Sequence, residues 1–91
     1  MKVVVAQEAR QSLIAITRYV RQFSPVAAKR LRVQITNRIR DLQDQPRMGR
    51  KVPEYDVDSI RELLEGEYRI WYRIADDTVE VVAIFHGARD V

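Results

Sequence analysis

The 91-residue chain is predicted to form a single α+β domain spanning residues 1–91, in which an antiparallel helical hairpin packs on one face of a mainly antiparallel sheet. Two observations predict this class. Apolar residues recur every three or four positions in residues 7–42, which is typical of amphipathic helices. β-Branched and aromatic residues dominate short segments near both ends of the chain, which is typical of strands. The predicted order is therefore strand, helix, helix, strand, strand, strand.

The first predicted elements are a strand and a helix. Residues 2–6 form a short β-branched run, which predicts a buried strand. From about Gln7 the period changes to that of an amphipathic helix, whose apolar stripe comprises Leu13, Ile16, Val20 and Phe23.

A second helix is predicted to begin at Ser24-Pro25, because serine caps free backbone amides and proline suits the first helical position. Pro46 and Gly49 end it. A residue or two separates the helices, so we expect them to lie antiparallel. The apolar stripe of the second helix comprises Ala28, Leu31, Ile35, Ile39 and Leu42, and its basic face comprises Lys29, Arg30, Arg32, Arg38 and Arg40.

The rest of the chain is predicted to be a surface connection followed by three strands. The connection covers residues 47–58, and the strands cover 59–64, 67–75 and 78–85, separated by turns at Gly66 and Asp76-Asp77. In the middle strand, side chains alternate between the two faces. We expect one face to meet the helices, with Tyr68, Ile70, Tyr72 and Ile74, and the other to carry Arg69, Trp71 and Arg73.

Charge is distributed unevenly along the chain. Residues 1–51 contain twelve Lys and Arg residues and three acidic ones, whereas residues 52–91 contain four Arg and ten acidic residues. Two interpretations stay open at this point. The two halves form solvated faces that pair with each other, or the basic half is a docking surface for an acidic partner.

Composition excludes several kinds of chemistry. Cysteine is absent, which excludes disulfides, thiolate metal sites and a thiol nucleophile. His86 is the only histidine, and there is no glycine-rich phosphate loop, so we expect neither a metal site nor a cofactor. The N-terminal apolar run is too short for a signal peptide, and no run is long enough to span a membrane. We expect a cytoplasmic protein with no membrane partner.

The two arginines that flank Trp71 are the first candidates for binding. Arg69, Trp71 and Arg73 on one face would suit stacking on a base or holding a phosphate. The alternative, which composition favours, is that Trp71 covers the sheet while the arginines form cross-strand pairs with Glu62, Glu65 or Glu80. The carboxylates of residues 54–67 look dispersed, so we expect them to solvate the surface. His86, near the end of the last strand, is more simply a structural residue than a base.

Four motifs occur in order along the chain: AxxxLxxIxxYV (9–20), LxxQPRMG (42–49), RELLEGEYRIWYRI (61–74) and VEVVAIFHGARD (79–90). Together they resemble the RelE/ParE family, the toxins of bacterial type II toxin–antitoxin systems. The resemblance covers nearly the whole chain and implies the same order of strands and helices. It also implies that the chain is the toxin component of such a system.

The family has two branches with different activities. RelE-like members cut messenger RNA on the ribosome, and ParE-like members inhibit DNA gyrase by binding it. At the positions where the RNA-cutting branch carries lysines, this chain has Ile60 and Glu62, and a glutamate would oppose the charge of a phosphorane-like transition state. That branch also places a catalytic tyrosine or histidine beyond the point where this chain stops, at Val91. The resemblance therefore favours a ParE-like gyrase inhibitor, which is not an enzyme.

Two alternatives remain. One is a RelE-like ribosome-dependent endoribonuclease, whose catalytic residues would be Arg69, His86 and Arg89, with His86 as the general base. The other is a non-toxic member of the family that only binds an antitoxin.

The resemblance also implies partners and surfaces. The cognate antitoxin would be ParD-like, a small DNA-binding dimer whose acidic C-terminal segment contacts the hairpin at Leu13, Ile16, Val20, Leu31, Ile35 and Arg38. The target would be DNA gyrase or, alternatively, the ribosome and its mRNA. Candidate target-binding residues are Arg61, Arg69, Trp71, Arg73, His86 and Arg89. Arg61 alternates with Leu63, so it can instead face the core side of its strand. There its pairing with a carboxylate would have a structural role.

Overall fold

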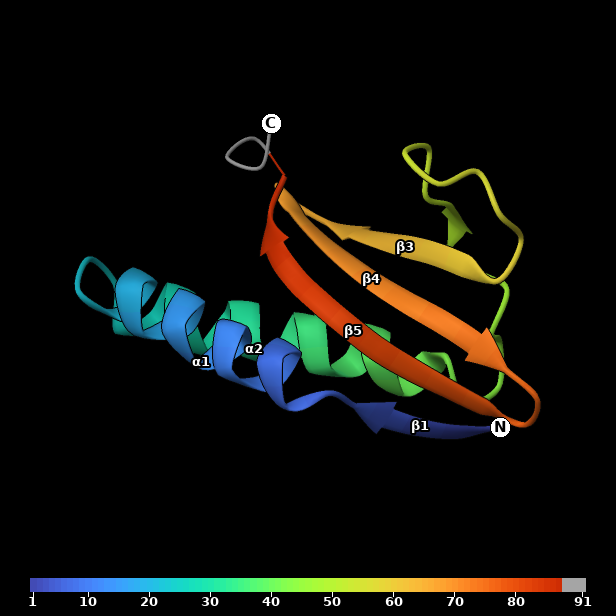
Figure 1. Cartoon of the computed structure of the whole chain (residues 1–91). Coiled ribbons are helices and arrows are strands. Elements are labelled where there is room, and N and C mark those ends of the chain that lie inside the picture. Colours follow the sequence, from blue (N-terminus) through green and yellow to red (C-terminus); the bar gives the residue numbers. More distant parts are fainter. Residues whose placement is uncertain (88–91) are drawn as a thin grey trace.

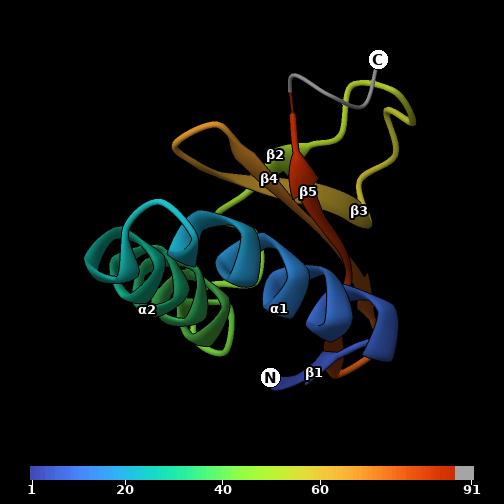
Figure 2. The same ribbon diagram turned by 90° about the vertical axis from the view of Figure 1, so that its left-hand side faces the viewer.

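The computed structural model describes residues 1–87 of the chain. Two helices form a hairpin that covers one face of a five-stranded sheet, as Figures 1 and 2 show, so the predicted α+β class is confirmed. No helix in residues 1–87 has the length and apolar character needed to cross a bilayer. The elements are β1 (Lys2–Val5), α1 (Gln7–Arg21), α2 (Pro25–Asp41), β2 (Arg50–Lys51), β3 (Ile60–Glu65), β4 (Tyr68–Ala75) and β5 (Thr78–His86).

The sheet has the strand order β1-β5-β4-β3-β2. Neighbouring strands are antiparallel except for β1 and β5, which run parallel. The predicted boundaries of β3, β4 and β5 are right to within one residue. The short strand β2, which pairs with β3, lies inside the segment 47–58 that the sequence predicted to be a surface connection.

Two predictions about burial are wrong. The strand near the N-terminus was expected to be buried, but β1 is an edge strand with alternate residues exposed, because only one face of the sheet is covered by helices. Phe23 was expected on the apolar stripe of the first helix, but its side chain is 73% exposed. Since α1 ends at Arg21, the turn carries Phe23 away from the core, and its ring contacts Tyr19 instead.

The predicted start of the second helix is confirmed. The Ser24 hydroxyl accepts a hydrogen bond from the backbone N–H of Ala27 at 3.1 Å, and Pro25 occupies the first turn of α2. This cap satisfies one of the amides that a helix leaves free at its N-terminus.

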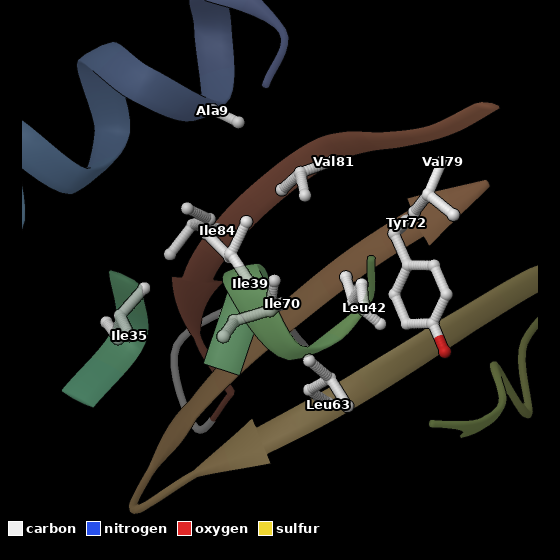
Figure 3. Packing of buried hydrophobic residues seen from close by; sticks show 10 residues of the cluster. All are labelled: Ala9, Ile35, Ile39, Leu42, Leu63, Ile70, Tyr72, Val79, Val81 and Ile84. Carbon is white, nitrogen blue, oxygen red and sulfur yellow. The ribbon is translucent and has the colours of Figure 1, made fainter. Parts of the chain in front are cut away.

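The core lies between the hairpin and the sheet (Figure 3). The helix-facing side of β4 is the one predicted by alternation, since Ile70 and Tyr72 are fully buried and Ile74 packs against the core. The hydroxyl of Tyr72 accepts a hydrogen bond from the backbone N–H of Gly49 at 2.9 Å, and burial raises the pKa of this phenol. Ten buried residues form the cluster: Ala9, Ile35, Ile39, Leu42, Leu63, Ile70, Tyr72, Val79, Val81 and Ile84.

A bulge interrupts the pairing of β4 with β5. Trp71 pairs with Ala83 but the next residue, Tyr72, pairs with Val81, so Val82 is an extra residue on β5. An extra residue reverses the alternation of side chains beyond it. Odd-numbered residues of β5 therefore face the helices before the bulge, and even-numbered ones face them after it.

Candidate functional site

The face of the sheet opposite the helices, which we call the open face, carries a compact group of charged and aromatic side chains. Residues that pair directly across an antiparallel ladder share a face. Glu62 of β3 pairs with Trp71 of β4, and Arg69 of β4 pairs with Phe85 of β5. The four side chains are therefore neighbours on the open face.

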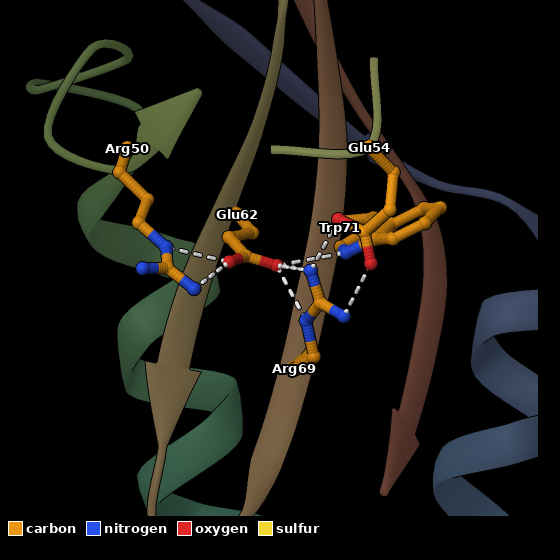
Figure 4. Close-up of polar contacts among 5 residues, drawn as sticks. All are labelled: Arg50, Glu54, Glu62, Arg69 and Trp71. Carbon is orange, nitrogen blue, oxygen red and sulfur yellow. Dashed lines mark hydrogen bonds and ion pairs between the residues drawn. The ribbon is translucent and has the colours of Figure 1, made fainter. Parts of the chain in front are cut away.

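Glu62 is a fully buried carboxylate at the centre of this group, with 1% of its surface exposed. Its Oε2 accepts a hydrogen bond from Nε of Arg50 at 2.6 Å. Its Oε1 accepts bonds from Nε of Arg69 at 2.6 Å and from the indole N–H of Trp71 at 2.9 Å (Figure 4). Both oxygens are thus satisfied by charged or aromatic donors, as a buried carboxylate requires.

Arg69 is held from a second side by Glu54. The two terminal nitrogens of Arg69 donate to the two carboxylate oxygens of Glu54, each at 2.9 Å, in a bidentate pair. The guanidinium also lies 5.2 Å from the ring centroid of Trp71 and 5.5 Å from that of Phe85. Hydrogen bonding to Arg69 lowers the pKa of the Glu54 carboxyl to about 2, and the bond to Glu54, followed by that to Glu62, raises the pKa of Arg69.

Glu54 belongs to residues 52–59, a segment that we call the strap. It crosses the open face after β2, and the ring of Tyr55 meets that of Trp71 edge-on at 5.6 Å. The strap explains why Glu62 is buried on a face that the helices do not cover. The expectation that the carboxylates of residues 54–67 are dispersed and merely solvate the surface is therefore wrong for Glu54 and Glu62.

The cross-strand pairing that composition favoured is confirmed for both arginines that flank Trp71. Arg69 pairs with Glu62, and Arg73 pairs with Glu80 at 3.1 Å. The Arg73 side chain is half exposed. Among the residues that the structure describes, no group of three His, Asp or Glu side chains is placed to hold a metal ion.

His86 lies on the other side of the sheet from Arg69. It pairs with Tyr68, and the two rings meet edge-on at 5.2 Å. Its Nε2 lies 3.2 Å from a carboxylate oxygen of Glu67. With Ala15, Ile16 and Tyr19 of α1, His86 and Tyr68 line a pocket of about 260 Å³.

Two of the three candidate residues for an RNA-cutting site, Arg69 and His86, are therefore not brought together on one face of the sheet. Arg69 is on the open face and His86 is on the helix side, because the bulge at Val82 reversed the alternation in β5. Arg89, the third candidate, lies outside the described residues.

The sequence model of one protein family, described as "ParE toxin of type II toxin-antitoxin system, parDE", matches residues 3–91 of the chain. The chain belongs to this family. It is 36% identical over 89 residues to Toxin RelE2 of Caulobacter vibrioides, an alignment that covers 97% of each protein. The chain also has the fold of a solved structure described as a chromosomal ParDE TA system from P. aeruginosa, with a TM-score of 0.76, 24% identity, and coverage of 94% and 95% of the two chains.

The protein is thus the toxin of a type II toxin–antitoxin system, and the family implies a cognate antitoxin as its partner. The hairpin residues expected to bind the antitoxin differ in how far they are buried in the toxin. Ile35 is fully buried in the core, which removes its side chain from any contact surface in this conformation. Arg38 lies 3.8 Å from Glu65. The other four are partly buried: Leu13, Ile16, Val20 and Leu31.

Arg61 occupies the core side of β3, as its alternation with Leu63 allowed. It pairs across the ladder with Tyr72, and 13% of its side chain is exposed. Its guanidinium donates to the backbone oxygen of Gly49 at 2.8 Å, to that of Asp58 at 3.0 Å, and to the carboxylate of Asp58 at 2.7 Å. In the toxin, Arg61 therefore holds the residue before β2 and the end of the connection between β2 and β3 against the sheet.

Replacing Arg61 by alanine is expected to lower the free energy of unfolding by about 2 kcal/mol, because hydrogen bonds that involve a charged group contribute roughly this much. Urea unfolding followed by circular dichroism measures the change. Arg73→Ala is the matched control, since it removes one half-exposed ion pair and should cost below about 1 kcal/mol. Equal losses for the two variants would contradict the structural role of Arg61.

Two members of this network, Arg50 and Glu54, and the burial of Glu62 were not predicted from the sequence. A signal existed for Glu62, since it alternates with Leu63 and must share a face with Trp71 once β3 and β4 pair. No comparable signal existed for Arg50, because a two-residue strand leaves no periodic pattern. Glu54 sits in an irregular segment, and its pairing with Arg69 follows only from the path of the strap.

Proposed function

We propose that the toxin inhibits DNA gyrase by binding it and that it does not cleave messenger RNA. The observation that carries this proposal is the separation of Arg69 and His86 on opposite faces of the sheet. Cleavage of a phosphodiester needs a base and a cation within hydrogen-bond reach of the same phosphate. A base on the helix side and a cation on the open face do not meet this requirement.

The charges around Arg69 support the same proposal. Arg69 bonds Glu62 and Glu54, so two carboxylates surround the cation that would have to stabilise a phosphorane-like transition state. Glu62 lies where the RNA-cutting branch of the family carries a lysine. A buried negative charge at that position would raise the energy of a developing oxyanion and not lower it.

The open face also suits binding to a protein. It exposes Tyr55, Arg73 and the neighbourhood of Trp71, and Tyr, Arg and Trp are the residue types that most often dominate the energy of protein interfaces. Arg73 is well placed for such a role, because its side chain is half exposed and its only described ion pair is with the partly exposed Glu80.

A ribosome-dependent endoribonuclease is the second candidate. One observation favours it, namely that the 36% identical relative carries the name Toxin RelE2. A non-toxic member of the family that acts only as an antitoxin-binding module is the third.

Two assays with the purified toxin separate the candidates. We expect inhibition of gyrase supercoiling and no codon-specific cuts in mRNA on translating ribosomes. Arg73→Ala should raise the toxin concentration for half-maximal inhibition by about tenfold, the loss typical of a moderate interface contact. Arg18→Ala, which changes an exposed residue in the last turn of α1, is the control and should stay within about twofold.

The opposite pattern, codon-specific cuts with gyrase unaffected, would overturn the proposal in favour of the endoribonuclease. A toxin that is inactive in both assays but binds its antitoxin tightly would point to the non-toxic module. Equal effects of Arg73→Ala and Arg18→Ala would argue that gyrase contacts a surface other than the open face.

A further inference from the structure

A pocket of about 400 Å³ opens on the edge of the open face, beside the strap. Its polar wall contains Arg50, Arg69 and Glu54, and its apolar wall contains Pro53 and Leu64. Leu64 is about half exposed, so this wall is open to solvent. The pocket thus combines cationic groups with an apolar surface that could receive an aliphatic side chain.

The guanidinium of Arg69 presents two edges in this pocket. Its inner edge, Nε and Nη2, lies 2.6 Å from Oε1 of Glu62, which is fully buried and also bonds Arg50 and Trp71. Its outer edge, Nη1 and Nη2, faces Glu54, whose side chain is 50% exposed, so Nη2 contacts both carboxylates. Glu62 is therefore a fixed part of the sheet, whereas Glu54 can be exchanged for another acceptor that arrives from solvent.

We propose that the outer edge of Arg69 is a binding site for a carboxylate of an acidic polypeptide, and that Glu54 occupies this site until such a partner displaces it. The bidentate contact of Glu54, with two bonds of 2.9 Å, shows that the slot has the size and orientation that a carboxylate needs. In the free toxin this carboxylate is supplied by Glu54 of the same chain.

The local charge favours a carboxylate over a phosphate. With Glu54 displaced, Arg50 and Arg69 together face one buried negative charge, that of Glu62, so a single positive charge remains uncompensated. A second acid, Glu67, lines the same pocket. One incoming negative charge balances this site, whereas a chain of phosphates would meet Glu62 and Glu67 as well. The apolar wall formed by Pro53 and Leu64 also fits the methylene groups of a glutamate better than a sugar-phosphate backbone.

Protonation does not release the Glu54 contact at neutral pH, because Arg69 lowers the pKa of Glu54 to about 2. A carboxylate of a partner must therefore compete with an ionised Glu54, and its apparent affinity is reduced according to the fraction of molecules in which Arg69 is free of Glu54. This inference does not rest on gyrase being the target, since any protein partner can present the carboxylate.

Trp71 provides a local measurement of the site. It is the only tryptophan in the chain, and its ring lies beside Arg69 and Tyr55. Its fluorescence should respond to a ligand at Arg69 and not to peptide held by the basic residues of the hairpin. The probe is a hexaglutamate peptide with blocked termini, titrated into the full-length toxin, with a thymidine octanucleotide as the phosphate-bearing comparison.

Removing the competitor should tighten binding of the probe. We expect Glu54→Ala to bind hexaglutamate about fivefold more tightly than the wild type, the factor expected when a moderate intramolecular ion pair no longer competes. Glu67→Ala is the matched control, because it removes the same charge from the same pocket without freeing Arg69, and it should change the affinity less than twofold. Adding Arg69→Lys to Glu54→Ala should abolish the gain in affinity for hexaglutamate, since lysine lacks the two parallel N–H donors of a guanidinium.

Three results would overturn the proposal: equal affinities of the wild type, Glu54→Ala and Glu67→Ala; a gain that survives Arg69→Lys; or tighter binding of the octanucleotide than of hexaglutamate. Circular dichroism and urea unfolding check that each variant is folded. If Glu54→Ala is unstable, Glu54→Gln keeps the shape of the side chain and should still bind the probe more tightly than the wild type. Failure of Glu54→Gln to do so would also count against the site.

Discussion

Replacing Glu62 by alanine is expected to lower the free energy of unfolding by at least about 3 kcal/mol, the usual cost of removing one partner from a buried ion pair. The substitution leaves the indole N–H of Trp71 and the Nε of Arg69 without an acceptor under the strap. It also leaves Arg50 to turn toward solvent, because that side chain is more than half exposed. Urea unfolding at neutral pH, followed by circular dichroism and by Trp71 fluorescence, measures the loss.

Two control variants separate the charge of Glu62 from its shape. Glu62→Gln keeps the shape and one acceptor oxygen but turns an N–H₂ donor toward other donors, so an intermediate loss of about 2 kcal/mol is expected. Glu80→Ala removes a partly exposed carboxylate from the neighbouring ion pair and should cost below about 1 kcal/mol. A Glu62→Ala loss as small as that of Glu80→Ala would show that the buried network does not stabilise the sheet.

Replacing Gly49 by alanine is expected to be comparably damaging, at about 3 kcal/mol, the upper part of the range for overpacked cores. A Cβ at this position would lie 2.5 Å from the backbone oxygen of Glu62 and 2.7 Å from the hydroxyl of Tyr72. The backbone of β3 cannot retreat without breaking its pairing with β4. Thermal unfolding should show a melting temperature lowered by at least about 10 °C for a domain of this size.

Gly66→Ala is the matched control for this experiment. Gly66 has a φ of 60°, but no atom lies within 4 Å of the Cβ that alanine would add. Its substitution therefore costs only the strain of a left-handed alanine, on the order of 1 kcal/mol. Equal losses at the two glycines would mean that the close approach of Gly49 to Tyr72 and Glu62 is not what requires glycine at position 49.

The elements that could be predicted from the sequence are those with a local signal. The two helices and the last three strands repeat their apolar pattern over several turns or pairs, and Ser24, Gly66 and Asp76-Asp77 mark where they begin or end. β2 is too short to carry such a pattern. The exposure of Phe23 depends on where α1 stops, and periodicity alone cannot show that a stripe continues beyond the last helical residue.

The site was predictable only in part, for a similar reason. Alternation placed Arg69, Trp71 and Arg73 on one face, and this is confirmed. The burial of Glu62 depends on the strap, an irregular segment that folds back over the sheet. No periodic pattern in the sequence predicts the path of such a segment. The position of His86 depends on one extra residue, Val82, because a bulge reverses every side chain beyond it. Contacts between distant segments decided both outcomes.

The parallel pairing of β1 with β5 also has a kinetic consequence. β5 lies between β1 and β4, and its register joins Lys2 to Thr78 and Val5 to Val81, residues at nearly opposite ends of the described chain. Forming this ladder closes a loop that contains both helices and three strands, and such long-range closure slows folding. The other long ladders, β3 with β4 and β4 with β5, join strands that are neighbours in sequence, so the pairing of β1 is the long-range step of assembly. Folding of the toxin should therefore be slow for a domain of this size in stopped-flow experiments.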